Sequence, residues 1–120
     1  MKIACGTDII EIDRIKKSIE HIGDRFLNTI FTEREIEYCE AHQNNKYQHY
    51  AARFAAKEAI YKALSKISSV GRVKWKKIEI INNTYGKPEI VIDDERIESI
   101  DISISHCKNY AVANVVILYN

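Results

Sequence analysis

The middle of the 120-residue chain reads Arg53-Phe54-Ala55-Ala56-Lys57-Glu58-Ala59-Ile60-Tyr61-Lys62. This stretch lies within an Ala-, Lys- and Glu-rich segment, residues 47–67, whose composition strongly favours a helix. Apolar residues recur in it at helical spacing and predict one buried stripe: Ala52, Ala55, Ala56, Ala59, Ile60 and Ala63. Because these side chains are mostly small, we expect a sheet to pack closely against this stripe.

Before this helix, the chain predicts a strand and two shorter helices. Residues 2–12 are typical of a strand, and isoleucines at 15, 19 and 22 then have helical spacing. Asp13 is placed to cap that helix. Thr32-Glu33-Arg34-Glu35 fits a capping box that opens a short helix toward Ala41.

After Gly71 the pattern changes to strands, predicted at residues 75–81, 89–92, 100–105 and 111–118. Turns are expected at residues 85–88 and 108–109. The order of strand, helices and then strands predicts an α+β fold. We expect a mainly antiparallel sheet packed with a long central helix and shorter N-terminal helices, in a single domain over residues 1–120.

Charge and cysteine content exclude several classes of protein. A net charge of +1 makes nucleic acid an unexpected partner, and no apolar stretch is long enough to predict a membrane span. The three cysteines have no CxxC spacing and are typical of reduced thiols in a cytoplasmic protein. No Cys/His set has zinc spacing, so any metal should be a hard cation bound by oxygen.

Asp8 is the first unusual side chain, since strand alternation places it on the same face as Ala4, Gly6 and Ile10. A carboxylate on an apolar face is costly unless a cation or several donors meet it. One interpretation is a ligand site that Gly6 leaves room to approach. The other is an acid that caps a neighbouring helix or pairs with an arginine.

Glu58 falls nearly opposite the apolar stripe of the central helix, with Phe54 and Tyr61 one turn away on either flank. A fully solvated face does not need two aromatic residues, so this face is predicted to be half-buried. Lys62 follows Glu58 at i+4. The alternative is an ordinary surface pair of Glu58 with Lys62.

His106 ends the alternating segment Ile102-Ser103-Ile104-Ser105-His106, on the isoleucine face. It is either a hydrogen-bonded core residue or part of a site at the strand end. Two carboxylates suit Mg²⁺, which keeps water and completes its shell with substrate phosphates, better than an all-protein Ca²⁺ cage. With a lysine and a histidine added, the residues indicate Mg²⁺-assisted chemistry on a phosphate or pyrophosphate.

Four motifs, in the expected order, resemble those of the holo-acyl-carrier-protein synthases, which are 4′-phosphopantetheinyl transferases. They are Gly6-Thr7-Asp8-Ile9-Ile10-Glu11-Ile12, Arg53-Phe54-Ala55-Ala56-Lys57-Glu58-Ala59, Gly86-Lys87-Pro88 and Ser103-Ile104-Ser105-His106. The resemblance implies an enzyme that transfers 4′-phosphopantetheine from coenzyme A to a serine of apo-acyl-carrier protein. It also implies 3′,5′-ADP as the other product and fatty acid biosynthesis as the pathway.

The resemblance also implies roles for individual residues. Asp8 and Glu58 would bind Mg²⁺, for which Mn²⁺ could substitute. The catalytic set would be Glu58, Lys62 and His106. The coenzyme A contacts would be Arg53, Lys57, Lys62, Gly86, Pro88, Ser105 and His106.

Family members are trimers with sites between adjacent subunits, so the resemblance implies a homotrimer. The carrier protein is acidic, and Arg14, Lys17 and Arg25 are the expected docking residues. A solvated helix face is the alternative for these side chains.

Two features depart from the family pattern. Residues 65–72 contain one glycine where family members commonly have a glycine-rich stretch, and Tyr85 and Cys107 replace smaller or hydroxylated residues. The alternative to an enzyme is therefore a binding module for carrier protein or nucleotide that kept the fold and lost turnover.

Overall fold

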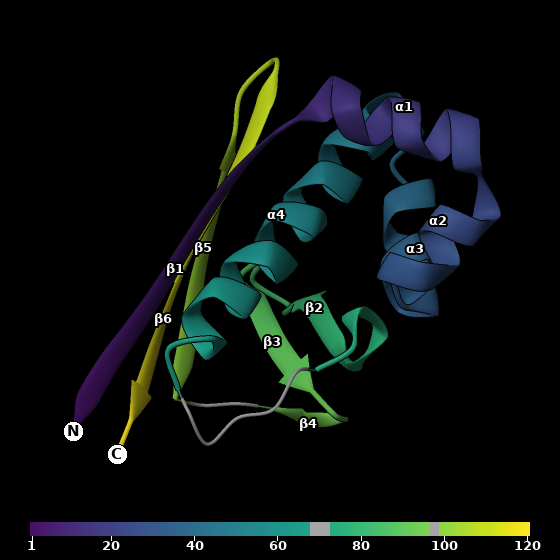
Figure 1. Ribbon diagram of the computed structural model, residues 1–120. Helices are drawn as coiled ribbons and strands as arrows, with labels where there is room; N and C mark the ends of the chain where they lie inside the picture. Colours follow the sequence, from purple (N-terminus) through teal and green to yellow (C-terminus); the bar gives the residue numbers. More distant parts are fainter. Residues whose placement is uncertain (68–72, 97–98) are drawn as a thin grey trace.

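The computed structural model describes residues 1–67, 73–96 and 99–120. Its centre is the helix α4 (Lys46–Leu64), which lies along one face of an antiparallel sheet (Figure 1). The strands of that sheet run in the order β1 (Lys2–Glu11), β6 (Tyr110–Tyr119) and β5 (Ile100–His106). The chain's first and last strands are therefore paired along their whole length.

The predicted apolar stripe of α4 is confirmed. All six of its members are buried, and they face the sheet residues Ala4, Ala111, Ala113 and Val115 across the core. The alternation predicted for β1 is also confirmed: Ala4, Gly6 and Ile10 are buried, Asp8 is half-buried, and the residues between them are exposed. Small side chains on both sides let the helix and the strand approach closely.

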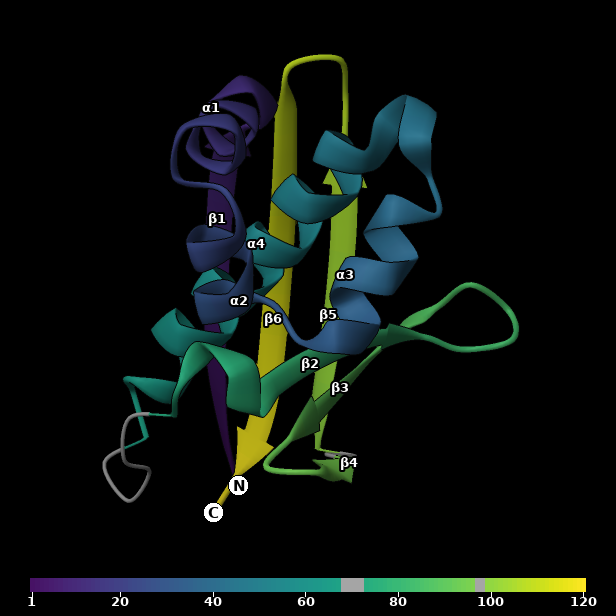
Figure 2. The ribbon, with the colours of Figure 1, turned by 90° about the vertical axis from the view of Figure 1, so that its right-hand side faces the viewer.

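Three shorter helices cover the other side of α4: α1 (Ile12–Ile22), α2 (Asp24–Ile30) and α3 (Glu33–Glu40) (Figure 2). The capping box of α3 is present, with Thr32 Oγ1 accepting from Glu35 N and Glu35 Oε1 accepting from Thr32 N. The prediction that Asp13 caps α1 is wrong, because Glu11 is the N-cap residue and makes no side-chain cap bond. Asp13 lies in the first turn, where its charge favours the helix dipole.

The remaining strands form a second antiparallel sheet instead of extending the first. Its order is β2 (Ile78–Asn82), β3 (Pro88–Ile92) and β4 (Glu95–Arg96). The strand predicted from residue 75 begins at Ile78, since Trp75–Lys77 is a 3₁₀ turn. A second 3₁₀ turn, Gln43–Asn45, precedes α4. The α+β class and the antiparallel pairing are thus confirmed, with two sheets in place of one.

Within the described ranges, no helix is long and apolar enough to cross a membrane.

Candidate active site

Asp8 is held at the point where β1 crosses α4 most closely. A β-carbon at Gly6, two residues earlier, would overlap the carbonyl oxygen of Ala59 and lie 2.9 Å from the amide nitrogen of Ala63. Only glycine permits this approach. The packing therefore sets Asp8 against the exposed end of α4, and its side chain keeps 16% of its surface accessible.

Lys62 joins the helix to this strand. Its Nζ donates to Asp8 Oδ1 at 3.2 Å and to the carbonyl oxygen of Thr7 at 2.9 Å. One turn later, Lys66 Nζ donates to the carbonyl oxygen of Cys5 at 2.8 Å. The two lysines donate to carbonyl groups along β1, which is an edge strand of its sheet. They therefore make this edge less available for pairing with a strand of another chain. Lys66 was not among the predicted site residues.

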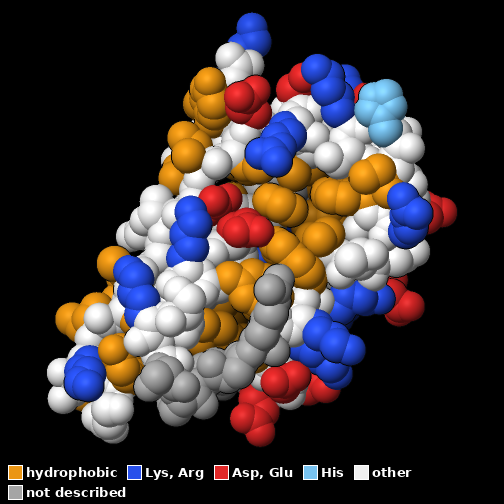
Figure 3. All heavy atoms as spheres, viewed as in Figure 1, with side chains coloured by type: hydrophobic (Ala, Val, Ile, Leu, Met, Phe, Trp, Pro, Cys, Tyr) orange, Lys and Arg blue, Asp and Glu red, His pale blue; other side chains and the backbone are white. Residues whose placement is uncertain are grey.

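Glu58 lies one turn before Lys62 on α4 and is half-buried, as predicted. Phe54 and Tyr61, its aromatic flanks, both contact Trp75, with ring centroids 5.3 Å and 5.0 Å apart. Figure 3 shows acidic side chains grouped near the crossing of β1 and α4, with a basic side chain beside them and an apolar surface next to them.

The donor set at this crossing fits a hard divalent cation. Asp8 and Glu58 supply carboxylate oxygens, and the ammonium of Lys62 at Asp8 Oδ1 marks a place where positive charge is accommodated. Among the described residues, no group of three or more His, Cys, Asp and Glu side chains could hold a metal ion. Two carboxylates would leave the remaining positions of a Mg²⁺ shell to water and substrate oxygens.

Arg53 lies on the other side of α4, because nine residues separate it from Lys62 and correspond to about 180° of rotation. It is 4% exposed, its guanidinium lies 4.1 Å from the ring centroid of Tyr38, and its Nε has no hydrogen-bond partner. Arg53 lines a cleft of about 380 Å³ together with Tyr38 and Asn82. Asn82 pairs in register with Pro88. Two of the predicted coenzyme A residues, Arg53 and Pro88, therefore lie at or beside this cleft.

His106 is exposed at the end of β5, and its Nδ1 lies 2.6 Å from Nε2 of Gln48 on α4. Next to Gln48, burial and the charges of His42, Arg53 and His106 lower the pKa of His49 to about 4. His106 and Arg53 therefore both lie close enough to His49 to affect its pKa. Ser105 is exposed on the opposite face of β5 from His106, so the two do not point to the same place.

Gly86 lies at the exposed tip of the β2–β3 hairpin with a φ of +80°, which only glycine adopts without strain. Its amide donates to the carbonyl oxygen of Asn83, and Asn83 Oδ1 accepts from the amides of Tyr85 and Lys87. The side chain of Tyr85 is 94% exposed and makes no part of the core.

Lys57 does not fit the contact with coenzyme A that sequence analysis predicted. Its side chain is fully buried, and Nζ donates to Glu35 Oε1 at 2.6 Å and to the carbonyl oxygens of Ile30 and Trp75. All three ammonium hydrogens are thereby used. Glu35 also accepts from the amide of Ile80, so this pair ties α2, α3, α4 and β2 together.

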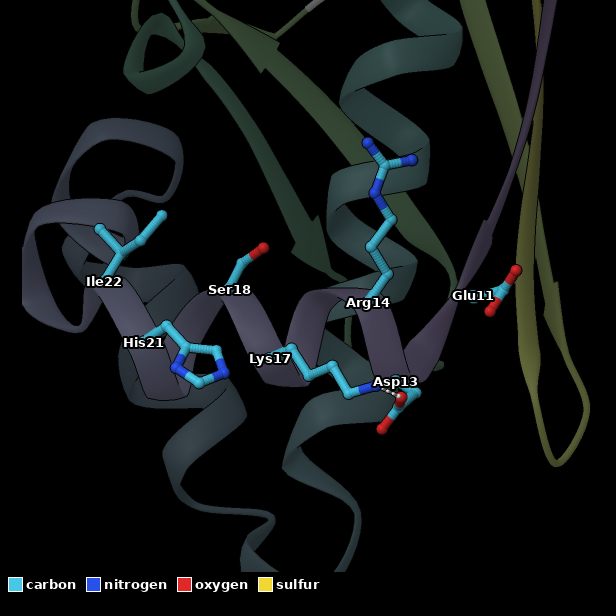
Figure 4. Close-up of a pocket in the computed structure, with 7 residues that line it drawn as sticks. All are labelled: Glu11, Asp13, Arg14, Lys17, Ser18, His21 and Ile22. Carbon is cyan, nitrogen blue, oxygen red and sulfur yellow. Dashed lines mark ion pairs between the residues drawn. The ribbon is translucent and has the colours of Figure 1, made fainter.

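The predicted docking residues lie on α1 and α2. Figure 4 shows a pocket along α1, in which Arg14 points away from Lys17. Lys17 forms an exposed ion pair with Asp13 at 2.9 Å. Arg25 is exposed on α2. Residues 68–72, most of the glycine-poor segment, lie outside the described residues.

Comparison with known proteins identifies the class. Residues 4–115 match the model of the 4′-phosphopantetheinyl transferase superfamily. The chain is 51% identical to holo-[acyl-carrier-protein] synthase of Thermodesulfovibrio yellowstonii, over 93% of this chain and 95% of the relative. It is 45% identical to the synthase of Ruminiclostridium cellulolyticum, over 98% and 92%.

Solved structures of synthases are similar to this chain as well. The synthase from Bacillus anthracis, in complex with CoA (3′,5′-ADP), has a TM-score of 0.78 at 37% identity, covering 95% of this chain and 94% of that one. The Helicobacter pylori synthase, in complex with coenzyme A, has a TM-score of 0.80 at 32% identity, covering 95% and 99%. The chain belongs to the 4′-phosphopantetheinyl transferase superfamily and, within it, to the holo-[acyl-carrier-protein] synthases. The expectation of an enzyme, as opposed to a binding module, is confirmed.

Proposed function

We propose that the protein transfers 4′-phosphopantetheine from coenzyme A to a serine of apo-acyl-carrier protein and releases 3′,5′-ADP, as a step of fatty acid biosynthesis in the cytoplasm. One observation carries the proposal: Lys62 of α4 bonds Asp8 where β1 crosses the helix, and Glu58 lies one turn before Lys62 on α4. The solved relatives that bind coenzyme A support the choice of donor. The three cysteines are free, which suits a reducing compartment.

Asp8 and Glu58 would hold Mg²⁺, and Mn²⁺ would fit the same oxygen ligands. The bound ion would supply positive charge against the negative charge that develops on the pyrophosphate oxygens. The ammonium of Lys62 would bind a phosphate oxygen as a point charge, since its side chain is 52% exposed and can turn from Asp8 to a ligand. Glu58 would accept the proton of the attacking serine at its carboxylate.

Arg53 and His106 would contact the coenzyme A end of the substrate, with Gly86 and Pro88 nearby and Ser105 in a supporting position. Lys57 is left out of this set because its ammonium is fully enclosed. Arg53 and Lys62 lie on opposite faces of α4. A ligand that contacts both groups is therefore best placed between two copies of the chain, with one group from each.

The outer face of the β1–β6 sheet supports association of copies. It exposes apolar side chains on both strands, including Ile3 and its register partner Leu118, and Cys5 opposite Val116. Ile9 adds to this surface and is 64% exposed. A patch of this kind is typical of an interface. We propose a homotrimer, to be checked by light scattering of the purified protein.

Docking of the acidic carrier is assigned to Arg14, Lys17 and Arg25. The decisive experiment incubates the protein with apo-carrier protein, coenzyme A and Mg²⁺ and then weighs the carrier. Gain of one phosphopantetheine group is the expected result. Unmodified carrier in the presence of all three components would reject the proposed function, and heat-treated protein is the control.

A further inference from the structure

Gln48 is the side chain that meets His106, and a second contact agrees with the direction of its amide. Gln48 Oε1 accepts from Nδ2 of Asn45 at 3.3 Å, and the amide nitrogen Nε2 faces His106. This nitrogen lies 2.6 Å from Nδ1 of the ring. An amide NH₂ can only donate. Nδ1 of His106 must therefore accept, and the proton of the neutral ring lies on Nε2.

A second imidazole, that of His49, lies beside this contact. His49, the residue after Gln48, is itself kept neutral by a pKa that burial and neighbouring charges lower to about 4. Arg53 contributes positive charge on the same side of α4. His106 is exposed at a strand end, so its Nε2–H is left to face solvent or a ligand.

We propose that Gln48 is a positioning residue: it holds His106 in the Nε2–H tautomer and aims that N–H as a donor at a phosphate of coenzyme A. This proposal rests on the proposed function for its ligand, but the tautomer itself is a property of the free protein. A hydrogen bond to one ring nitrogen of a histidine sets the tautomer and so decides what the other ring nitrogen can do. The link could not be read from the sequence, since 58 residues separate the two positions.

The first test is nitrogen NMR of the imidazole rings in the free, full-length protein near neutral pH, with His106→Asn to assign the signal. We expect Nδ1 bare and Nε2 protonated in the wild type. Gln48→Leu should give a mixture of tautomers, and Gln48→Glu should place a proton on Nδ1. A wild-type ring protonated on Nδ1, or one unchanged in both variants, overturns the proposal.

The second test compares kinetic constants for both substrates. Gln48→Leu should raise the KM for coenzyme A about fivefold, the effect of one neutral hydrogen bond, with the KM for carrier and kcat nearly unchanged. Gln43→Leu is the matched control, since Gln43 lies in the same segment and its Nε2 bonds Glu40 instead. Equal changes in both KM values would indicate a structural effect and overturn the positioning role.

The failure of this proposal is distinguishable from failure of the proposed function. If the wild-type protein does not modify the carrier, the proposed function fails, while the tautomer measured without substrate is unaffected. Calorimetric titration with coenzyme A then replaces the KM measurement, and an unchanged Kd in Gln48→Leu overturns the proposal.

Discussion

Gly6 lies so close to Ala59 that a β-carbon on the strand would overlap the carbonyl oxygen of the helix. The neighbouring atoms are backbone and cannot turn aside. This contact determines where Asp8 is presented, because Asp8 is two residues further along the same face of β1. The geometry of the candidate metal site thus depends on a residue with no side chain.

Replacing Gly6 by alanine should therefore separate β1 from α4. We expect a loss of about 1–3 kcal/mol of unfolding free energy, as for other overpacked cores, together with reduced turnover. Chemical denaturation followed by circular dichroism measures the first effect. Ser103→Val, which also enlarges a strand residue but at an exposed position, should change little. A Gly6→Ala protein with wild-type stability would mean that the strand does not need this close approach.

Asp8→Asn and Glu58→Gln should each lower turnover by about 100-fold or more, the range found when a charge-stabilising group is removed. Asp8→Asn should change the free energy of unfolding little. Its partner Lys62 is half exposed, and ion pairs of this kind contribute about 1 kcal/mol or less. The measurement is carrier modification over a range of Mg²⁺ concentrations, beside thermal unfolding. A near-normal rate at low Mg²⁺ in either variant would remove that carboxylate from the metal site.

Lys57→Met should destabilise the protein strongly, although Lys57 makes no contact with substrate in the proposed site. Burial lowers the pKa of Lys57 and Glu35 opposes this, so removal of the lysine leaves a buried carboxylate without its counterion. Breaking such a pair costs about 3–5 kcal/mol. The double variant Lys57→Met/Glu35→Leu should recover part of that loss in denaturant titrations. If the single variant were fully stable yet bound coenzyme A poorly, Lys57 would have to be returned to the substrate site.

Acid should destabilise the protein through His49. Burial, and then His42 and Arg53, lower the pKa of His49 from 6.5 to about 4. Between these values the unfolded chain binds more protons than the folded protein, so stability is complete above about pH 6.5 and falls as pH drops toward 4. His49→Phe should reduce this acid-dependent loss in thermal unfolding, whereas exposed His21→Gln should not. The same acid profile in wild type and His49→Phe would contradict the assignment.

Charge reversal at Arg14 tests the docking surface. Arg14→Glu should raise the KM for carrier far more than the KM for coenzyme A, because a rim charge acts mainly on encounter with an acidic partner. Lys17→Glu should have a smaller effect, since Lys17 is already paired with Asp13. The two KM values are measured in separate titrations at constant ionic strength. A parallel rise in both would count against docking at α1.

Local patterns made much of the fold predictable. The alanine stripe of α4 and the capping box at Thr32 depend on spacings of three and four residues, and both are present. The cap at Asp13 was placed wrongly because the helix begins at Ile12, two residues earlier than a cap at Asp13 requires. The helix α2 was missed because its seven residues carry no side-chain cap.

Contacts between distant residues could not be predicted. Lys57 belongs to the family motif, but its partner Glu35 is 22 residues away, so no local pattern separated Lys57 from the substrate contacts. The one local sign that Lys57 is buried was its i+4 spacing from Arg53, on a flank of the helix that is otherwise apolar. Asp8 and Lys62 are 54 residues apart, and only the general expectation of a cation beside a carboxylate on an apolar face pointed to their contact.

The pairing of β1 with β6 has a consequence for how the protein is made. During synthesis, the strand that carries Asp8 leaves the ribosome well before β6, its only partner strand in the described structure. Pairing of strands this far apart in the sequence is slow, since it waits for a long loop to close. The nascent protein therefore has α4 and Lys62 in place long before Asp8 can be fixed beside them. Activity should appear only after β6 is complete, because Asp8 pairs in register with Ala113 of that strand.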